Sequence, residues 1–148
     1  MAPVGRTVAT NGPLRLVRVA QPLRTLWGAG GFGDDGWSNP TTTPFVRLYS
    51  SPETAGRRVV VALTVTAPAS AIHPRRVDVR GSIGNAGGWA PAGGAVTITV
   101  RVCVPRSKAR DLGLIVHGST RVDGRPTGIA LLTADVKPDG VCGHRAAP

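Results

Sequence analysis

The sequence predicts an all-β protein: a two-sheet antiparallel β-sandwich of jelly-roll type, with about eight strands and little or no helix. No window of eleven or more residues places apolar side chains at helical spacing, and glycine or proline interrupts most such windows. Short segments instead alternate apolar and polar residues, as in the row Val59, Val61, Leu63 and Val65. Turns rich in glycine and proline separate these segments. The pattern is typical of two sheets, each with one buried and one wet face.

The expected strands follow one another every ten to twenty residues. Two weaker candidates span residues 14–20 and 23–27, and six clear ones span residues 43–50, 57–67, 75–83, 95–104, 112–118 and 127–137. Turns are expected at residues 51–53, 85–88, 91–94 and 123–126. The last strand begins apolar on both faces, so we expect it in the centre of a sheet.

The chain length fits one domain. With 148 residues and 15.2 kDa there is no room for a second independent core. We expect an N-terminal arm at residues 1–12, the sandwich at 13–138 and a C-terminal tail at 139–148.

Two cysteines, Cys103 and Cys142, allow one intramolecular disulfide. Alternation places Cys103 on the solvent side of its strand, together with Thr99 and Arg101, where it is available for pairing. A bridge would pin the C-terminal tail to that strand, contribute about 3 to 4 kcal/mol and indicate an oxidising compartment. The alternative is two free thiols in a cytosolic protein.

The charge favours anionic partners. There are 18 Lys and Arg residues against 8 Asp and Glu, a net charge of +10, and arginine presents a planar fork to phosphate, carboxylate or sulfate. The candidate contacts are Arg75, Arg76, Arg106, Lys108 and Arg110. The alternative is a solvated basic face in an arginine-rich proteome. Sequence-specific nucleic-acid binding is not expected, because no aromatic residues interleave with these clusters.

No stretch of 18 apolar residues occurs, so membrane insertion is not expected. The first twenty residues also lack the apolar core of a secretory signal. Because a disulfide is expected, the expected location is extracytoplasmic or on a cell surface, as an excised or mature domain whose export signal lies outside this sequence. The alternative is a virion component made in the cytosol.

The loop at residues 28–40 is the first candidate binding site. It combines glycines with Asp34, Asp35 and Trp37, and Trp89 is a further candidate. A sugar site uses an aromatic face against the C–H face of the ring, with carboxylates and arginines on the hydroxyls. The alternative is that these tryptophans lie in the core or cap a sheet edge. A structural Ca²⁺ is conceivable at the two aspartates but lacks ligands, so we expect no metal or cofactor.

No catalytic constellation is apparent. His73, His117 and His144 have no metal-ligand spacing, and Ser119 lacks the flanks of a nucleophile elbow. The aspartates on strands and turns lack the paired setting of a glycosidase. We therefore expect that the protein is not an enzyme.

The order of several segments resembles a known family. Residues 31–38 (GFGDDGWS), 45–48 (FVRL), 57–61 (RRVVV), 73–79 (HPRRVDV), 96–104 and 123–131 (DGRPTGIAL) look like the galactose-binding-like jelly-roll domains of bacterial envelope glycosyltransferases and surface proteins. The similarity covers about residues 28–138. The chain departs from the pattern at residues 81–85, where GSIGN replaces the usual Asn-Gly. The resemblance implies a non-catalytic sandwich that lies beside or holds a glycan.

Two functions are therefore expected as alternatives. The first is a non-catalytic binding module for an envelope or surface glycan, with an anionic polysaccharide as a plausible ligand. The second is a structural virion component, a phage decoration or capsid-type subunit. That subunit would form homo-oligomers through its sandwich and its N-terminal arm.

Overall fold

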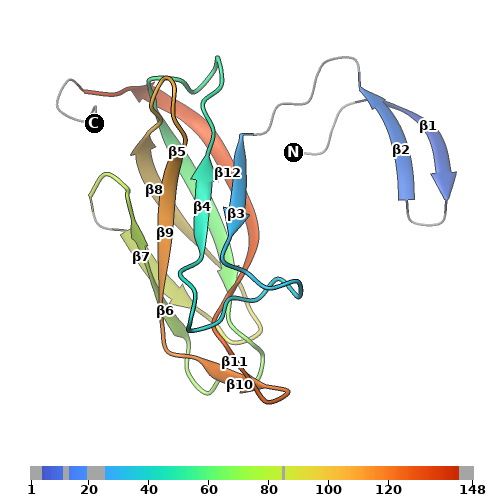
Figure 1. Cartoon of the computed structure of the whole chain (residues 1–148), viewed down its shortest axis with the longest axis vertical. Helices are drawn as coiled ribbons and strands as arrows, with labels where there is room; N and C mark the ends of the chain where they lie inside the picture. Colours follow the sequence, from blue (N-terminus) through green and yellow to red (C-terminus); the bar gives the residue numbers. More distant parts are fainter. Residues whose placement is uncertain (1–4, 12–13, 20–25, 85, 144–148) are drawn as a thin grey trace.

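Two antiparallel sheets packed face to face form the body of the molecule (Figure 1). This computed structural model describes residues 5–11, 14–19, 26–84 and 86–143, and within those ranges it contains twelve strands and no helix. No helix that could cross a membrane occurs in the described ranges. The predicted all-β sandwich is confirmed.

The larger sheet has five strands. In spatial order they are β3 (Trp27–Gly30), β4 (Phe45–Leu48), β9 (Arg110–His117), β6 (Arg75–Arg80) and β7 (Ala86–Ala90). The sheet therefore ends in β3 at one edge and β7 at the other. All of its strand pairings are antiparallel.

The smaller sheet has three strands, in the order β12 (Ala130–Val141), β5 (Arg57–Thr66) and β8 (Val96–Cys103). The strand β5 pairs along its length with both neighbours. A short hairpin of β10 (Thr120–Val122) and β11 (Arg125–Thr127) follows β9.

The core lies between the two sheets. Along β5 the side chains of Val59, Val61, Leu63 and Val65 are fully buried, as the alternation predicts. Each buried side chain of this size contributes about 1.5 to 3 kcal/mol. The facing layer from the larger sheet includes Val46, Leu48, Val77, Leu112 and Leu114.

The last strand is an edge strand, so the prediction of a central position was wrong. β12 pairs with β5 on one side, and β5 takes the centre. The start of this strand is apolar on both faces in the sequence because it contains a β-bulge between Leu131 and Thr133. At the bulge, Leu132 points outward and is 54% exposed. The strand also begins later and ends later than expected, at Ala130 and Val141.

The segment expected as a turn at residues 85–88 is largely strand, because β7 begins at Ala86. Its glycines pair with Val77 and Asp78 of β6. A glycine-rich run predicts a turn from composition, yet here Gly87 leaves room for side chains of the neighbouring strand, as shown below. The five-stranded and three-stranded sheets together contain eight strands, in line with the expected count, and the two hairpins add four more within the described ranges.

The N-terminal region forms a separate hairpin of β1 (Gly5–Asn11) and β2 (Leu14–Val19). These strands pair with each other and with no other described strand, and Figure 1 draws them apart from the sandwich. The hairpin spans the expected boundary between arm and domain at residues 12 and 13. The expected strand at 14–20 is confirmed as β2. Residues 23–25 of the expected strand at 23–27 lie outside the described residues, and Trp27 at its end begins β3.

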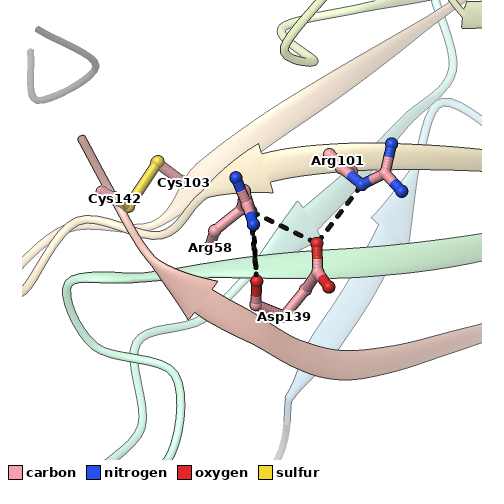
Figure 2. A network of polar contacts seen from close by, with 5 residues as sticks. All are labelled: Arg58, Arg101, Cys103, Asp139 and Cys142. Atoms are coloured by element: carbon pink, nitrogen blue, oxygen red, sulfur yellow. Dashed lines mark hydrogen bonds and ion pairs between the residues drawn. A yellow bond between two sulfur atoms is a disulfide. The ribbon is translucent and has the colours of Figure 1, made fainter.

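The disulfide between Cys103 and Cys142 is present, with 5.7 Å between the two Cα atoms. Figure 2 shows it beside Asp139, which accepts hydrogen bonds from two arginines. The backbone oxygen of Asp139 accepts from Arg58 Nε and Nη2 at 3.1 and 2.9 Å. Its Oδ2 atom lies 3.2 Å from Nε of both Arg58 and Arg101. The first residues of the expected tail are thus tied to β5 and β8.

Reduction of this disulfide should lower the free energy of unfolding by about 4 kcal/mol, because the bridge spans 39 positions of sequence and restricts the unfolded chain. Denaturant unfolding with and without reductant measures the change. A variant with both Cys103→Ser and Cys142→Ser is the control, since reductant should leave its unfolding unchanged. An unaltered unfolding midpoint of the reduced protein would contradict a stabilising role.

Candidate functional site

An open hollow of about 630 Å³ lies on the outer face of the five-stranded sheet, the side turned away from β5, β8 and β12. Strands β6, β7 and β9 supply its walls. The residues that line it are Arg76, Asp78, Val79, Arg80, Ala86, Gly87, Ile115 and His117. It is therefore a surface depression with basic, acidic and apolar groups within one sheet.

Alternation along β6 explains why charged side chains gather there. Val77 and Val79 are buried in the core, so Arg76, Asp78 and Arg80 point to the outer face. On β9, His117 lies directly opposite Arg76 and Ile115 directly opposite Asp78. Cross-strand partners share a face, so the register itself assembles the group.

Asp78 links β6 to β9 through both of its carboxylate oxygens. Arg76 donates to Oδ1 from Nε at 2.9 Å and from Nη2 at 2.8 Å. On the other side, Nε2 of His117 lies 2.8 Å from Oδ2. The carboxylate thus fixes both neighbouring side chains.

The same contacts hold the pKa of Asp78 below its ordinary value. The hydrogen bond from His117 is the largest cause, and the hydrogen bond and charge of Arg76 add to it, while burial acts in the opposite direction. An ionised carboxylate only accepts hydrogen bonds, so Nε2 of His117 is the donor. The ring nitrogen next to Asp78 therefore holds a proton.

Trp89 of β7 borders this group on the other side of Arg76. The two residues are cross-strand partners, and the guanidinium carbon of Arg76 lies 5.8 Å from the centroid of the indole. The residue is 58% exposed, so most of the ring is open to solvent. A flat aromatic surface is held beside a fixed guanidinium.

Gly87 makes the floor of the hollow possible. A Cβ atom built there would lie 2.7 Å from both Arg76 Nη2 and Asp78 Oδ1, and 2.8 Å from the carbonyl oxygen of Val77. The side chain of Arg76 crosses β7 only because this position has none. Gly113, on β9 opposite Arg80, is different, since its nearest neighbour would be 3.7 Å away, in ordinary contact.

Arg80 is the cation of the hollow that is available to a ligand. It is exposed, and within the described part of the chain no carboxylate or other side chain forms a hydrogen bond or ion pair with it. Arg76, in contrast, is engaged by Asp78. An anionic group entering the hollow would therefore meet the guanidinium of Arg80 first.

The expected site in the loop at residues 28–40 lies elsewhere. Asp34 is exposed, while Asp35 Oδ1 accepts a hydrogen bond from the backbone N–H of Trp37 at 3.1 Å. Trp37 is half-buried and bridges to Ala130 at the start of β12. The neighbouring Ser38 is buried, and its Oγ accepts from the N–H of Ile129 at 2.9 Å. The Asp35 carboxylate and the Trp37 backbone thus hold this turn against the second sheet.

The structure does not bring this loop together with Trp89. The loop follows β3 at one edge of the five-stranded sheet, and Trp89 lies on β7 at the opposite edge, with three strands between. At the usual strand spacing, the two edges are about 19 Å apart. Of the four expected glycan contacts, Trp89 alone borders the hollow.

The expected cationic contacts also divide into two groups. Arg76 lines the hollow, and the adjacent Arg75 donates to the carbonyl of Ser119 at 2.6 Å and to the hydroxyl of Thr120. The other three lie beyond the far end of β9 or at that end, which is about 24 Å from His117 along the strand. They are Arg106 and Lys108 in the β8–β9 connection and Arg110 as the first residue of β9.

Of the charged or titratable residues that line the hollow, Arg76 alone was predicted from the sequence as a site residue, and Asp78, Arg80 and His117 were not. The alternation of residues 75–80 does place Asp78 and Arg80 on the wet face of their strand, but it does not mark them as site residues. His117 lies 39 positions from Asp78, and only the register of β6 against β9 pairs them. No pattern in the sequence predicts that register.

Comparison with known proteins finds no matching family model, no similar curated protein and no similar solved structure. The resemblance to galactose-binding-like domains therefore stays a prediction. Among the described residues, no group of three or more His, Cys, Asp or Glu side chains is placed to hold a metal ion.

Gly87→Ala should lower the free energy of unfolding by about 1 to 3 kcal/mol, because the new methyl group overlaps Asp78, Arg76 and the β6 backbone. Denaturant unfolding measures the change. Gly113→Ala is the matched control, a glycine-to-alanine change in the same sheet with room for the methyl group. Equal stability of the two variants would contradict the close packing at Gly87.

The carboxyl titration of Asp78 should depend on His117. In wild type its midpoint should lie below the ordinary value of an aspartate, and His117→Ala should raise it, because the hydrogen bond from His117 is the largest cause of the lowered pKa. Carboxyl NMR signals followed against pH measure both midpoints. Asp111, whose pKa is lowered chiefly by its hydrogen bond from Arg47, is an internal control that should not move.

The sign of the stability effect follows from these lowered pKa values. Both carboxylates stabilise the fold at neutral pH, and this contribution is lost as the pH falls below about 4, through their lowered pKa values. An Asp78 midpoint unaffected by His117→Ala would contradict the assigned hydrogen bond.

Proposed function

We propose that this protein is a non-catalytic binding module for an acidic glycan of a cell envelope or surface, and that the glycan lies on the outer face of the five-stranded sheet. The observation that supports this most directly is the exposed indole of Trp89 beside a hollow that contains the unpaired Arg80. An indole packs against the C–H face of a sugar ring, and a guanidinium binds a carboxylate, sulfate or phosphate group through two parallel hydrogen bonds.

The fixed groups around Trp89 support the same ligand. Asp78 holds Arg76 against the indole, so the aromatic surface is presented in one orientation before binding. Preorganisation of this kind reduces the entropy lost on association. The hydroxyls of a sugar would find acceptors at the rim in the carboxylate oxygens of Asp78 and donors in the guanidinium of Arg80.

Charge supports an anionic rather than a neutral glycan. The chain has a net charge of +10, and Arg80 has no counterion among the residues that the structure describes. A neutral polysaccharide would leave this cation without a partner. An acidic one supplies the partner and is attracted from a distance.

The paired state of the aspartates supports a module without catalysis. Asp78 and Asp111 are both engaged by basic side chains and have lowered pKa values, which keeps them ionised. Glycoside hydrolysis uses two facing carboxyl groups, one of them protonated. The disulfide is also typical of oxidising compartments, which supports an extracytoplasmic location.

Trp89→Ala should weaken binding to an acidic polysaccharide such as polygalacturonate about tenfold, the loss of one stacking contact. Its melting temperature should stay close to wild type because the residue is 58% exposed. Arg80→Ala should weaken binding by a similar factor and reduce its salt dependence. Affinity electrophoresis and calorimetry measure these changes, with alginate and hyaluronan as further acidic probes and dextran as the neutral reference.

Lys137→Ala is the control for charge. It removes one positive charge from β12, on the other sheet, where Lys137 is paired with Asp135. Binding that falls equally in Arg80→Ala and Lys137→Ala would show attraction by net charge alone and would contradict the proposed site. Failure to bind any acidic polysaccharide would overturn the proposed function.

A further inference from the structure

A second group on the same sheet repeats the arrangement of Trp89, Arg76 and Asp78. The guanidinium carbon of Arg47 lies 5.1 Å from the ring centroid of Phe45. Arg47 is held by Asp111, with Nε to Oδ1 at 2.7 Å and Nη2 to Oδ2 at 2.9 Å. In both groups an arginine lies over an aromatic ring and is fixed by an aspartate.

Both groups point to the same face. On β9, Asp111, Gly113, Ile115 and His117 alternate with the buried Leu112 and Leu114 and therefore share the outer side. Asp111 lies directly opposite Arg47, and Gly113 directly opposite Phe45. Cross-strand partners share a face, so Arg47 and Phe45 are on the outer face with Arg76.

Two glycines of the edge strand β3 make room for aromatic rings at this end. A Cβ atom at Gly30 would overlap the ring of Phe45, and one at Gly28 would lie 3.2 Å from the hydroxyl of Tyr49. Tyr49 is 39% exposed. The β3 edge of the sheet thus offers a second aromatic surface beside a fixed guanidinium.

The two groups are too far apart for one sugar. Six positions of β9 separate His117, opposite Arg76, from Asp111, opposite Arg47, which corresponds to about 20 Å along the strand. Arg76 and Arg47 also lie two strands apart, about 10 Å across the sheet. A ligand that meets both groups must be an extended chain.

The path between the groups is lined by Ile115, Arg80 and Gly113. Arg80 and Gly113 are cross-strand partners near the middle of this path. Gly113 places no side chain in the way, and Arg80 offers its unpaired guanidinium. A chain crossing obliquely from β7 to β3 would therefore place an acidic group midway, with aromatic contacts at each end.

We propose that the ligand of the outer face is the interior of a linear acidic polysaccharide, several sugars long, which crosses the sheet obliquely from Trp89 to the group of Arg47, Phe45 and Tyr49. This inference rests on the proposed function and adds the length and direction of the ligand. A monosaccharide or a chain end would occupy the Trp89 end alone.

Affinity for oligogalacturonates of two, four, six and eight sugars tests the inference in calorimetry with the full chain. We expect affinity to rise from two to six sugars and then to level off. Arg47→Ala and Tyr49→Ala should weaken binding of the hexamer about tenfold, the equivalent of one lost contact, and leave the dimer unaffected. Lys137→Ala is again the charge control, and melting curves check that each variant folds.

The two proposals fail in different ways. Equal affinity for dimer and hexamer, or a hexamer unaffected by both Arg47→Ala and Tyr49→Ala, overturns the extended-chain inference. If Trp89→Ala still weakens binding about tenfold in that case, the proposed function stands. Absence of binding to every oligomer and to the acidic polysaccharides overturns the proposed function and this inference together.

Discussion

The register of β6 between β7 and β9 is the constraint on which the described outer face depends. Burial of Val77 and Val79 fixes that register, because a slip by one residue would turn Arg76, Asp78 and Arg80 into the core. Burying three charged side chains would cost far more free energy than any new contact on the outer face could return. Core packing therefore decides which side chains meet on the outside, and the Asp78 contact to His117 adds a polar link across the same pair of strands.

Glycine shapes the outer face as much as the side chains do. Gly87 lets Arg76 lie across β7, and Gly30 lets the ring of Phe45 lie over β3. Glycine weakens a strand interior, since it has no side chain to pack and loses more backbone entropy on folding. Placing it beneath an arginine or an aromatic ring offsets part of this cost through the contacts that it allows. The result is a sheet whose outer surface presents fixed guanidinium and ring groups close to the backbone.

Alternation allowed the buried face of β5 and the outward face of β8 to be predicted from the sequence, and the composition allowed the disulfide to be expected. Neither alternation nor composition could supply the order of the strands in each sheet, which depends on pairing between segments far apart in the sequence. Leu132 is an example: in the sequence it extends a run that is apolar on both faces and suggests a buried central strand, but in the structure it lies at a β-bulge and is exposed. The pairing of Asp78 with His117 is likewise a consequence of register. The strand that contains Gly87 was predicted as a turn because its sequence is rich in glycine. The loop of Asp34 and Trp37 matched a binding loop by composition, yet the structure uses Asp35 and Trp37 in local hydrogen bonds and bridges.

Backbone amide NMR of the protein titrated with polygalacturonate tests the central claim most directly, since it locates the ligand without any substitution. The account predicts that shifts concentrate on β6, β7 and β9 around the hollow and extend towards β4, while β5 and β12 stay unchanged. Shifts confined to the loop after β3, or to the outer side of the three-stranded sheet, would contradict the assignment of the binding face.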